Sequence, residues 1–275
     1  MQNNGNGEKK LNEALKRAAE EKGKAFEKAA EIPVAAPSHV PEPKPELKSE
    51  DFASGVNRKI VVYHNPTSQV SEQFRAMSAH VRSIEMSEGI KTIAVTSPTC
   101  GEGKSVVAVN MAVVMALDFS KPVVLIDCNM RRPSVGQLLG LHNSEGLSDL
   151  LSGRAQLQDV LIKTDVANLT VLPGGETALN PNELLASSKM VSVLSELKRQ
   201  FEVVILDTPA VIPYADPRIL SKIAEGVILV IRTGKTRREV VGRAENILNS
   251  VGANILGYVL TGIEYHIPEY IHRHL

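Results

Sequence analysis

The residues of this chain that could do chemistry begin at Ser97–Ser105, SPTCGEGKS. An apolar run, Ile90–Val95, precedes them, and a run rich in Ala, Val and Met, Val106–Leu117, follows. A strand, a glycine-rich turn and a helix opened by Gly-Lys-Ser are typical of a phosphate-binding loop. The strict pattern has glycine six residues before the lysine, where this chain has Pro98. A glycine-rich turn without a ligand is therefore the alternative.

Each part of the loop has a chemical use. Gly101 and Gly103 let the backbone wrap closely, so that successive N–H groups face one anion. Lys104 can reach the β- and γ-phosphates as a point charge, and the Ser105 hydroxyl can bind Mg²⁺. The residues expected to line the nucleotide here are Thr99, Cys100, Gly101, Glu102, Gly103, Lys104, Ser105 and Val106.

Two aspartates end apolar strands further along the chain. Asp127 follows four apolar residues in Val123–Pro133, VVLIDCNMRRP, and Asp207 follows four in Val203–Pro209, VVILDTP. Ligands of doubly wound sheets lie at the carboxyl ends of the strands, so both carboxylates are expected beside Ser105 as Mg²⁺ ligands. For either aspartate alone, the alternative is a helix N-cap or a turn residue.

These motifs in this order resemble the bacterial tyrosine kinases (BY-kinases), cytoplasmic kinases that regulate capsule and exopolysaccharide export, within the P-loop ATPases related to the Min/Par proteins. Ser71–Arg75, SEQFR, resembles the oligomerisation helix of the family, and Asn180–Leu185, NPNELL, resembles another family segment. Gly226–Thr236 and Ile255–Leu260 are similar to its last two strands. The resemblance covers about Ile60 to Leu260.

The resemblance implies a tyrosine autokinase with ATP and Mg²⁺ as cofactors. Its catalytic residues would be Lys104, Asp127 and Asp207, and its metal site would be Ser105, Asp127 and Asp207. Asp127 would also take the proton from a tyrosine hydroxyl. Arg232, after a late strand, would lie near the base or ribose of the nucleotide, although a loop role explains it equally well.

Three departures from the family pattern bear on the kinase assignment. Asn129 replaces the second aspartate of its motif and cannot act as a base. Ser78 stands where the oligomerisation motif has its second arginine. The tail, Gly262–Leu275, holds only Tyr265 and Tyr270 as phosphoacceptor candidates where the family has a tyrosine cluster. Packing of these tyrosines on the core or on a partner is the alternative.

A second hypothesis is therefore a non-kinase P-loop ATPase switch, Min/Par-like, that assembles with a membrane or polysaccharide-export partner. Asn129 and the sparse tyrosines favour it. Proteins of the Min/Par branch, however, carry an additional lysine early in the loop, and Thr99 occupies that position here. The two hypotheses differ in whether phosphotyrosine forms.

Composition predicts three parts. Residues 1–58 are charged, with proline concentrated in 33–45, and are expected to be flexible and disordered apart from a partly formed helix or docking helix over 11–30. Residues 59–262 are expected to form the P-loop domain, with an α/β, doubly wound, mostly parallel sheet and helices on both faces. Residues 263–275 form a short tyrosine-containing tail.

Several polar residues have two possible roles. Glu72 and Arg75 lie on an expected helix, 69–85, and would make either intersubunit contacts or an intrahelical pair. Arg131 and Arg132 would bind phosphate or a neighbouring subunit, or be surface cations. Asp216 would either shape the site or, as the preferred reading, be a helix N-cap. Cys100 and Cys128 lie in the nucleotide motifs, where a lowered thiol pKa at Cys100 would permit redox control and small residues would also simply fit.

Charge and hydropathy limit the partners. The formal net charge is zero, so no basic field indicates nucleic acid. The chain has neither an apolar signal region at its N-terminus nor an 18-residue apolar span. It is expected to be cytoplasmic and to be recruited to the inner face of the membrane by a separate transmembrane polysaccharide co-polymerase, a chain-length determinant protein. A homo-oligomer is also expected from the resemblance.

Overall fold

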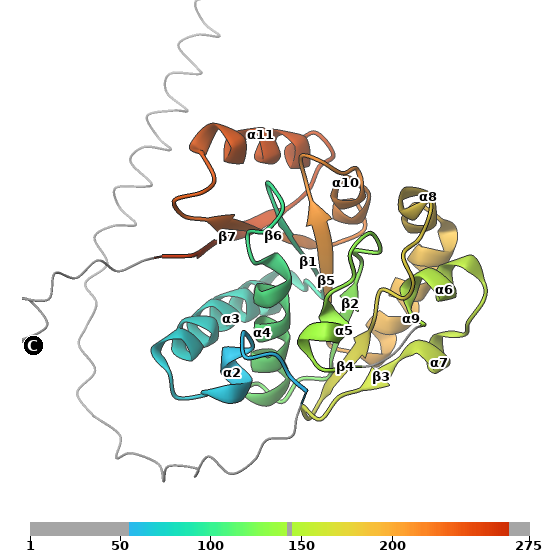
Figure 1. Cartoon of the computed structure of the whole chain (residues 1–275), viewed down its shortest axis with the longest axis horizontal. Helices are drawn as coiled ribbons and strands as arrows, with labels where there is room; N and C mark the ends of the chain where they lie inside the picture. Colours follow the sequence, from blue (N-terminus) through green and yellow to red (C-terminus); the bar gives the residue numbers. More distant parts are fainter. Residues whose placement is uncertain (1–54, 142–144, 264–275) are drawn as a thin grey trace, which may run out of the picture. The chain divides into compact units, whose positions relative to one another are not determined.

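A seven-stranded sheet lies at the centre of the described part of the chain, residues 55–141 and 145–263 of the computed structural model (Figure 1). The strand order is β3-β4-β2-β5-β1-β6-β7. The strands are β1 (Thr92–Ser97), β2 (Val123–Asp127), β3 (Ile162–Lys163), β4 (Leu169–Leu172), β5 (Val203–Ala210), β6 (Gly226–Arg232) and β7 (Ile255–Thr261). All neighbouring pairs are parallel except β3 with β4, which confirms the mostly parallel sheet.

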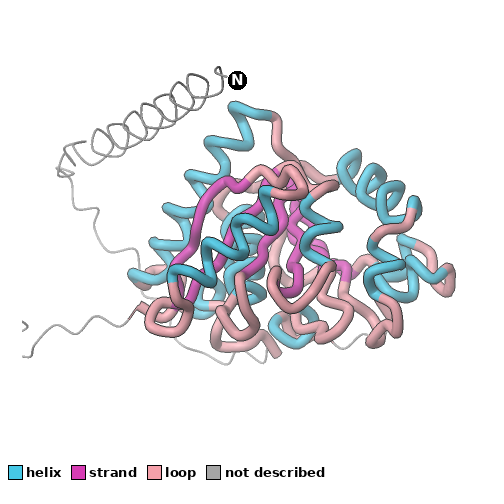
Figure 2. Tube along the Cα trace, turned by 90° about the horizontal axis from the view of Figure 1, so that it is seen from above, coloured by secondary structure: helices cyan, strands magenta, loops and turns pink. Residues whose placement is uncertain are grey.

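Helices cover both faces of this sheet (Figure 2). One layer comprises α2 (Val61–His64), α3 (Gln69–Glu88), α4 (Lys104–Leu117) and α5 (Val135–Leu138). The other comprises α6 (Leu147–Ser152), α7 (Leu157–Val160), α8 (Pro181–Leu185), α9 (Ser188–Gln200), α10 (Asp216–Ser221) and α11 (Arg238–Asn249).

The apolar strand runs alternate between the two layers. Val123 and Leu125 of β2 pack with α2–α5, whereas Val124 and Ile126 pack with α6–α11. Successive strand residues point to opposite faces, so a strand covered on both sides must be apolar throughout. This is why the motif aspartates stand out: each is a charged residue that directly follows four aliphatic residues of its strand.

Local hydrogen bonds and residue patterns explain where the elements that carry the site begin and end. The Ser71 N–H donates to the Ser68 Oγ at 3.1 Å at the start of α3, as an N-cap requires. The expected helix over 69–85 continues to Glu88, and β5 continues past Asp207 to Ala210. The fold also begins before residue 59, because the Asn57 N–H donates to the Leu138 carbonyl at 2.9 Å.

No helix among residues 55–141 and 145–263 combines the length and apolar character needed to cross a membrane. The expected helix over 11–30 and the two tail tyrosines, Tyr265 and Tyr270, lie outside the described residues.

Candidate active site

The phosphate-binding loop joins β1 to α4 and leaves the helix start open. Gly101 and Gly103 have φ of 78° and 90°, the left-handed conformation that favours glycine. Gly103 is the N-cap of α4, and no side chain caps its first N–H groups. Lys104 and Ser105 open the helix, with the lysine Nζ 3.3 Å from the serine Oγ. The loop therefore presents uncapped N–H groups, a cation and a hydroxyl to one anion.

Glu102 braces this loop from within. Its side chain is only 1% exposed, and its carboxylate accepts the Thr99 N–H at 2.9 Å, the Thr99 hydroxyl, and the Arg232 N–H at 3.3 Å. The Thr261 hydroxyl donates to the Glu102 carbonyl at 2.7 Å. The Glu102 side chain thus ties the loop to the end of β6, and its backbone carbonyl ties the loop to the end of β7.

The two motif aspartates lie side by side. Asp127 and Asp207 are directly paired in register across β2 and β5, and both are fully buried. Asp127 accepts three backbone N–H groups, from Asn129 at 3.0 Å, Ser134 at 2.7 Å and Val135 at 2.9 Å. Neither carboxylate oxygen of Asp207 makes a hydrogen bond of standard geometry within the described part of the chain. Asp207 is thus a buried carboxylate near Lys104 and Ser105 that makes no hydrogen bond of standard geometry, which is costly unless a cation binds it.

Burial raises the pKa of both carboxyls, and repulsion from Asp207 adds to the shift at Asp127. Burial is the larger cause at Asp127 and repulsion from Asp207 the second, and together they raise its pKa to about 7 against the opposing backbone hydrogen bonds. Burial also raises the pKa of Asp207, opposed by the Lys104 charge and the nearby Ser105 side chain. Two desolvated carboxylates facing a lysine and a hydroxyl suit a hard divalent cation, which would remove the repulsion. The residues present therefore fit Mg²⁺.

The segment after β2 is fixed by Asn129. Its side-chain N–H donates to the Arg132 carbonyl at 3.0 Å, and its backbone N–H donates to the Asp127 carboxylate. The asparagine that replaces the second aspartate of the family pattern therefore has a structural partner. Arg132 itself is exposed.

Arg131 is held within its own chain. Its Nε donates to the Asp216 carboxylate at 2.8 Å, its guanidinium lies 5.0 Å from the ring centre of Tyr214, and it also reaches Asn182. The Asp216 side chain is buried, so this ion pair connects the segment after β2 to α10. The expected N-cap role of Asp216 is wrong, because Ala215 is the N-cap and Asp216 is the first helical residue.

The two cysteines differ. The Cys128 thiol is buried, and burial, followed by repulsion from Asp127, raises its pKa well above the usual value. Cys128 is therefore protonated at neutral pH and chemically inert. Cys100 is exposed in the loop, where its carbonyl accepts a hydrogen bond from Lys235.

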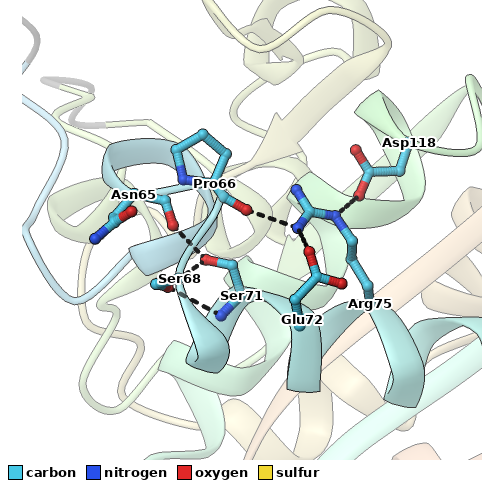
Figure 3. A network of polar contacts seen from close by, with 7 residues as sticks. All are labelled: Asn65, Pro66, Ser68, Ser71, Glu72, Arg75 and Asp118. Atoms are coloured by element: carbon cyan, nitrogen blue, oxygen red, sulfur yellow. Dashed lines mark hydrogen bonds and ion pairs between the residues drawn. The ribbon is translucent and has the colours of Figure 1, made fainter. Parts of the chain in front are cut away.

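The Arg75 network on α3 is intramolecular (Figure 3). Its guanidinium donates to Glu72 at 2.6 Å, to Asp118 at 2.6 Å and to the Pro66 carbonyl at 2.6 Å. The intrahelical Glu72–Arg75 pair therefore forms, and Asp118 was not anticipated. Ser78 is fully buried, so it belongs to the core-facing side of α3 rather than to an outer surface.

A second basic region adjoins the loop. Arg232, Thr233, Gly234, Lys235 and Gly262 line a cavity of about 730 Å³. Arg232 was expected near the nucleotide, whereas Lys235 in the same segment was missed because that segment is remote in sequence from the phosphate-binding loop. Only the fold brings its turn to the phosphate-binding loop.

Comparisons with known proteins agree with this geometry. Residues 90–251 match the family described as AAA domain. The tyrosine-protein kinase YwqD of Bacillus subtilis is 34% identical over 209 residues, covering 76% of this chain and 88% of YwqD. The kinase domain of the Escherichia coli tyrosine kinase ETK superposes with a TM-score of 0.73 at 26% identity, covering 76% of this chain and 81% of that domain.

The fold extends to ATPases that are not kinases. The septum site-determining protein MinD of Pyrococcus horikoshii, solved with Mg-ADP, gives a TM-score of 0.54 at 23% identity, covering 66% of this chain and 76% of MinD. This more distant likeness concerns the fold alone. The glycine-rich loop, the paired aspartates and the tyrosine-kinase relatives lead to one assignment: this chain belongs to the bacterial tyrosine-protein kinase family and is a protein-tyrosine kinase with the P-loop ATPase fold.

Proposed function

We propose that this kinase binds ATP–Mg²⁺ at the β1–α4 loop, phosphorylates Tyr265 and Tyr270 of its own tail, and thereby regulates exopolysaccharide or capsule chain length and export. The observation that carries the proposal is the buried carboxylate of Asp207, which makes no hydrogen bond of standard geometry within the described residues. It lies beside Lys104 and the uncapped start of α4. An anion and a divalent cation are the two ligands that suit this arrangement.

The loop would bind the nucleotide phosphates. The uncapped N–H groups at the start of α4 and the Lys104 ammonium would neutralise negative charge on the transferred phosphoryl group. Thr99, Cys100, Gly101 and Val106 would contribute mainly backbone to this cradle. Glu102 would act indirectly, by keeping the loop in its present shape.

Mg²⁺ would be held by Ser105, Asp207 and Asp127. Among the residues that the structure describes, no cluster of three His, Cys, Asp or Glu could hold a metal. The remaining ligands would therefore come from phosphate oxygens and water, as is usual for Mg²⁺. The bound ion would supply electrostatic stabilisation of the transferred phosphoryl group.

Asp127 is the proposed base for the tyrosine hydroxyl. Without the metal, burial and repulsion from Asp207 raise its pKa to about 7, so this carboxylate takes up a proton more readily than an exposed one. Its three backbone hydrogen bonds hold the carboxylate in a fixed orientation. Asn129 cannot replace it in this role, because its amide cannot accept a proton and is bound to the Arg132 carbonyl.

The proposed partner is a transmembrane polysaccharide co-polymerase, the chain-length determinant protein, which would recruit the kinase to the inner face of the cytoplasmic membrane. The family resemblance and the kinship with tyrosine-protein kinases support this proposal. A homo-oligomer would allow the tail of one copy to reach the site of another. No role for nucleic acid is proposed, since the formal net charge is zero.

Phosphotyrosine mapping tests the function. The full chain would be incubated with ATP–Mg²⁺ and analysed by mass spectrometry, beside a Tyr265→Phe/Tyr270→Phe double variant and a Tyr258→Phe control. Tyr258 is a suitable control because it is 53% exposed on β7 and lies outside the tail. We expect phosphate on the tail in the wild type and in the control, and its loss in the double variant. ATP hydrolysis without phosphotyrosine would instead identify an ATPase switch.

Nucleotide binding is expected to release protons near neutral pH. In the nucleotide-free chain Asp127 is about half protonated near pH 7, and Mg²⁺ binding requires the carboxylate. The affinity for ADP–Mg²⁺ should therefore fall as the pH drops below 7, by up to about tenfold per pH unit. Calorimetric titrations at pH 6 and 8, in buffers of different ionisation enthalpy, measure both effects. Binding at pH 6.5 without proton release would show that Asp127 is already ionised in the free protein.

A further inference from the structure

The turn between β6 and α11 reaches the phosphate-binding loop through one lysine. The Lys235 Nζ donates to the Cys100 carbonyl at 2.8 Å, although the two residues are 135 positions apart in the chain. It also lies 3.1 Å from the point where a Cβ would stand on Gly101. The ammonium of Lys235 therefore packs directly against the glycine-rich part of the loop.

Other contacts set the position of this turn, independently of the lysine side chain. The Arg232 N–H donates to the Glu102 carboxylate at 3.3 Å. The Thr233 hydroxyl bonds to the carbonyls of Thr261 at 2.9 Å and Gly262 at 2.8 Å. Gly234 has a φ of 72°, which permits a tight turn. The backbone thus fixes the turn beside the loop, and the Lys235 side chain is free to change its acceptor.

The charge around this turn is not balanced. Arg232 and Lys235 line the same cavity of about 730 Å³. Within residues 55–141 and 145–263, neither of them forms an ion pair. The hydrogen bond from Lys235 goes to a neutral carbonyl, and an ammonium has three donors. A phosphate oxygen is a stronger acceptor for such a cation than a peptide carbonyl.

We propose that Lys235 is a nucleotide-binding residue that brings a second ammonium to the phosphates of the nucleotide, beside Lys104. The ligand class is a nucleoside di- or triphosphate, and the inference rests on the proposed binding of nucleotide at this loop. The contact with the Cys100 carbonyl is the position of the side chain in the nucleotide-free chain. The β6–α11 turn would then close one side of the phosphate site from within the same chain.

Equilibrium titration of the full chain with ADP–Mg²⁺ tests this assignment. The variants are Lys235→Met, the conservative Lys235→Arg, and Lys163→Met as the control, because Lys163 is exposed on β3 at the opposite edge of the sheet. We expect Lys235→Met to weaken binding about tenfold and Lys235→Arg to restore most of it. Lys163→Met should bind as the wild type does.

The salt dependence separates a direct phosphate contact from bracing of the loop. If Lys235 contacts the phosphates directly, the loss of affinity in Lys235→Met should be smaller at about 500 mM salt than at about 50 mM salt, because salt screens exposed charges. A dissociation constant within about twofold of Lys163→Met, or a defect that is equal at both salt concentrations, overturns the proposal. Absence of ADP–Mg²⁺ binding to the wild type would overturn nucleotide binding itself, whereas the kinase function is judged separately by phosphotyrosine.

Discussion

Lys104→Met is expected to reduce tyrosine phosphorylation of the full chain by about 10² to 10⁴-fold. Methionine keeps the length and the apolar stem of the side chain but removes the charge that would neutralise the β- and γ-phosphates. Lys104 lies at the first position of α4, within 3.3 Å of the Ser105 hydroxyl, and its charge also opposes the raised pKa of Asp207. Its loss should therefore weaken both phosphate and metal binding.

The measurement is the initial rate of phosphotyrosine formation with ATP–Mg²⁺, followed by mass spectrometry. Lys163→Met is again the matched control, since it makes the same chemical change on an exposed part of β3. Circular dichroism would show that both variants are folded. Activity of Lys104→Met within about threefold of the control would mean that the lysine is not at the reacting phosphate.

Asp207→Asn is expected to stabilise the nucleotide-free chain and to abolish its response to Mg²⁺. The Asp207 oxygens are buried without hydrogen bonds, and its charge repels Asp127. Asparagine removes the buried charge and keeps the shape. Losing the attraction to Lys104 opposes this gain, but burial is the larger influence on the Asp207 pKa. The expected net gain at pH 8 is about 1 to 3 kcal/mol in the free energy of unfolding.

The raised pKa of Asp127 determines how the stability of the folded chain changes with pH. Between the unfolded pKa of 3.8 and the folded value of about 7, Asp127 binds more protons in the folded chain, so stability falls as the pH rises through this window. Near pH 5 Asp127 is protonated and no longer repels Asp207. The advantage of Asp207→Asn should therefore be largest at pH 8 and shrink toward pH 5.

Urea unfolding in the presence of a chelator measures this difference, and thermal unfolding with ADP, with and without Mg²⁺, measures the metal response. Asp159→Asn on α7 is the control, because Asp159 is exposed. The wild type and the control should gain stability from Mg²⁺, and Asp207→Asn should not. An Asp207→Asn variant that is less stable at pH 8 but retains its Mg²⁺ response would refute both the unpartnered carboxylate and its role in the metal site.

Much of the fold follows from short-range features of the sequence. Four-residue apolar runs such as Val203–Leu206, each followed by an aspartate, indicate strands covered on both faces, and the Gly-Lys-Ser sequence marks a strand-to-helix turn. These signals predicted the doubly wound sheet, with Lys104 at the start of a helix and Asp127 and Asp207 after apolar strand residues. The structure confirms that Asp127 and Asp207 are direct neighbours, because β2 and β5 pair in register.

Side-chain partners distant in sequence could not be predicted in the same way. Asp216 looked like an N-cap because it precedes an apolar stretch, but its carboxylate binds Arg131, 85 residues earlier. Arg75 could be paired with Glu72 from helical spacing alone, whereas its bond to Asp118 depends on how α3 packs against α4. Such contacts depend on which elements the fold makes adjacent.

The sequence by itself determined the chemistry that is possible: a phosphate loop, two carboxylates and an aliphatic α/β core, all encoded in contiguous motifs. The tertiary structure sets the surroundings of these groups, that is, their hydrogen-bond partners and their neighbouring charges. In the folded chain Asp207 makes no hydrogen bond of standard geometry, whereas Asp127 accepts three backbone N–H groups. The Glu102 side chain is buried beneath the loop, and Lys235 contacts the loop from the β6–α11 turn. The physical reason is that burial, repulsion and hydrogen bonding depend on distances between elements, which local propensity does not specify.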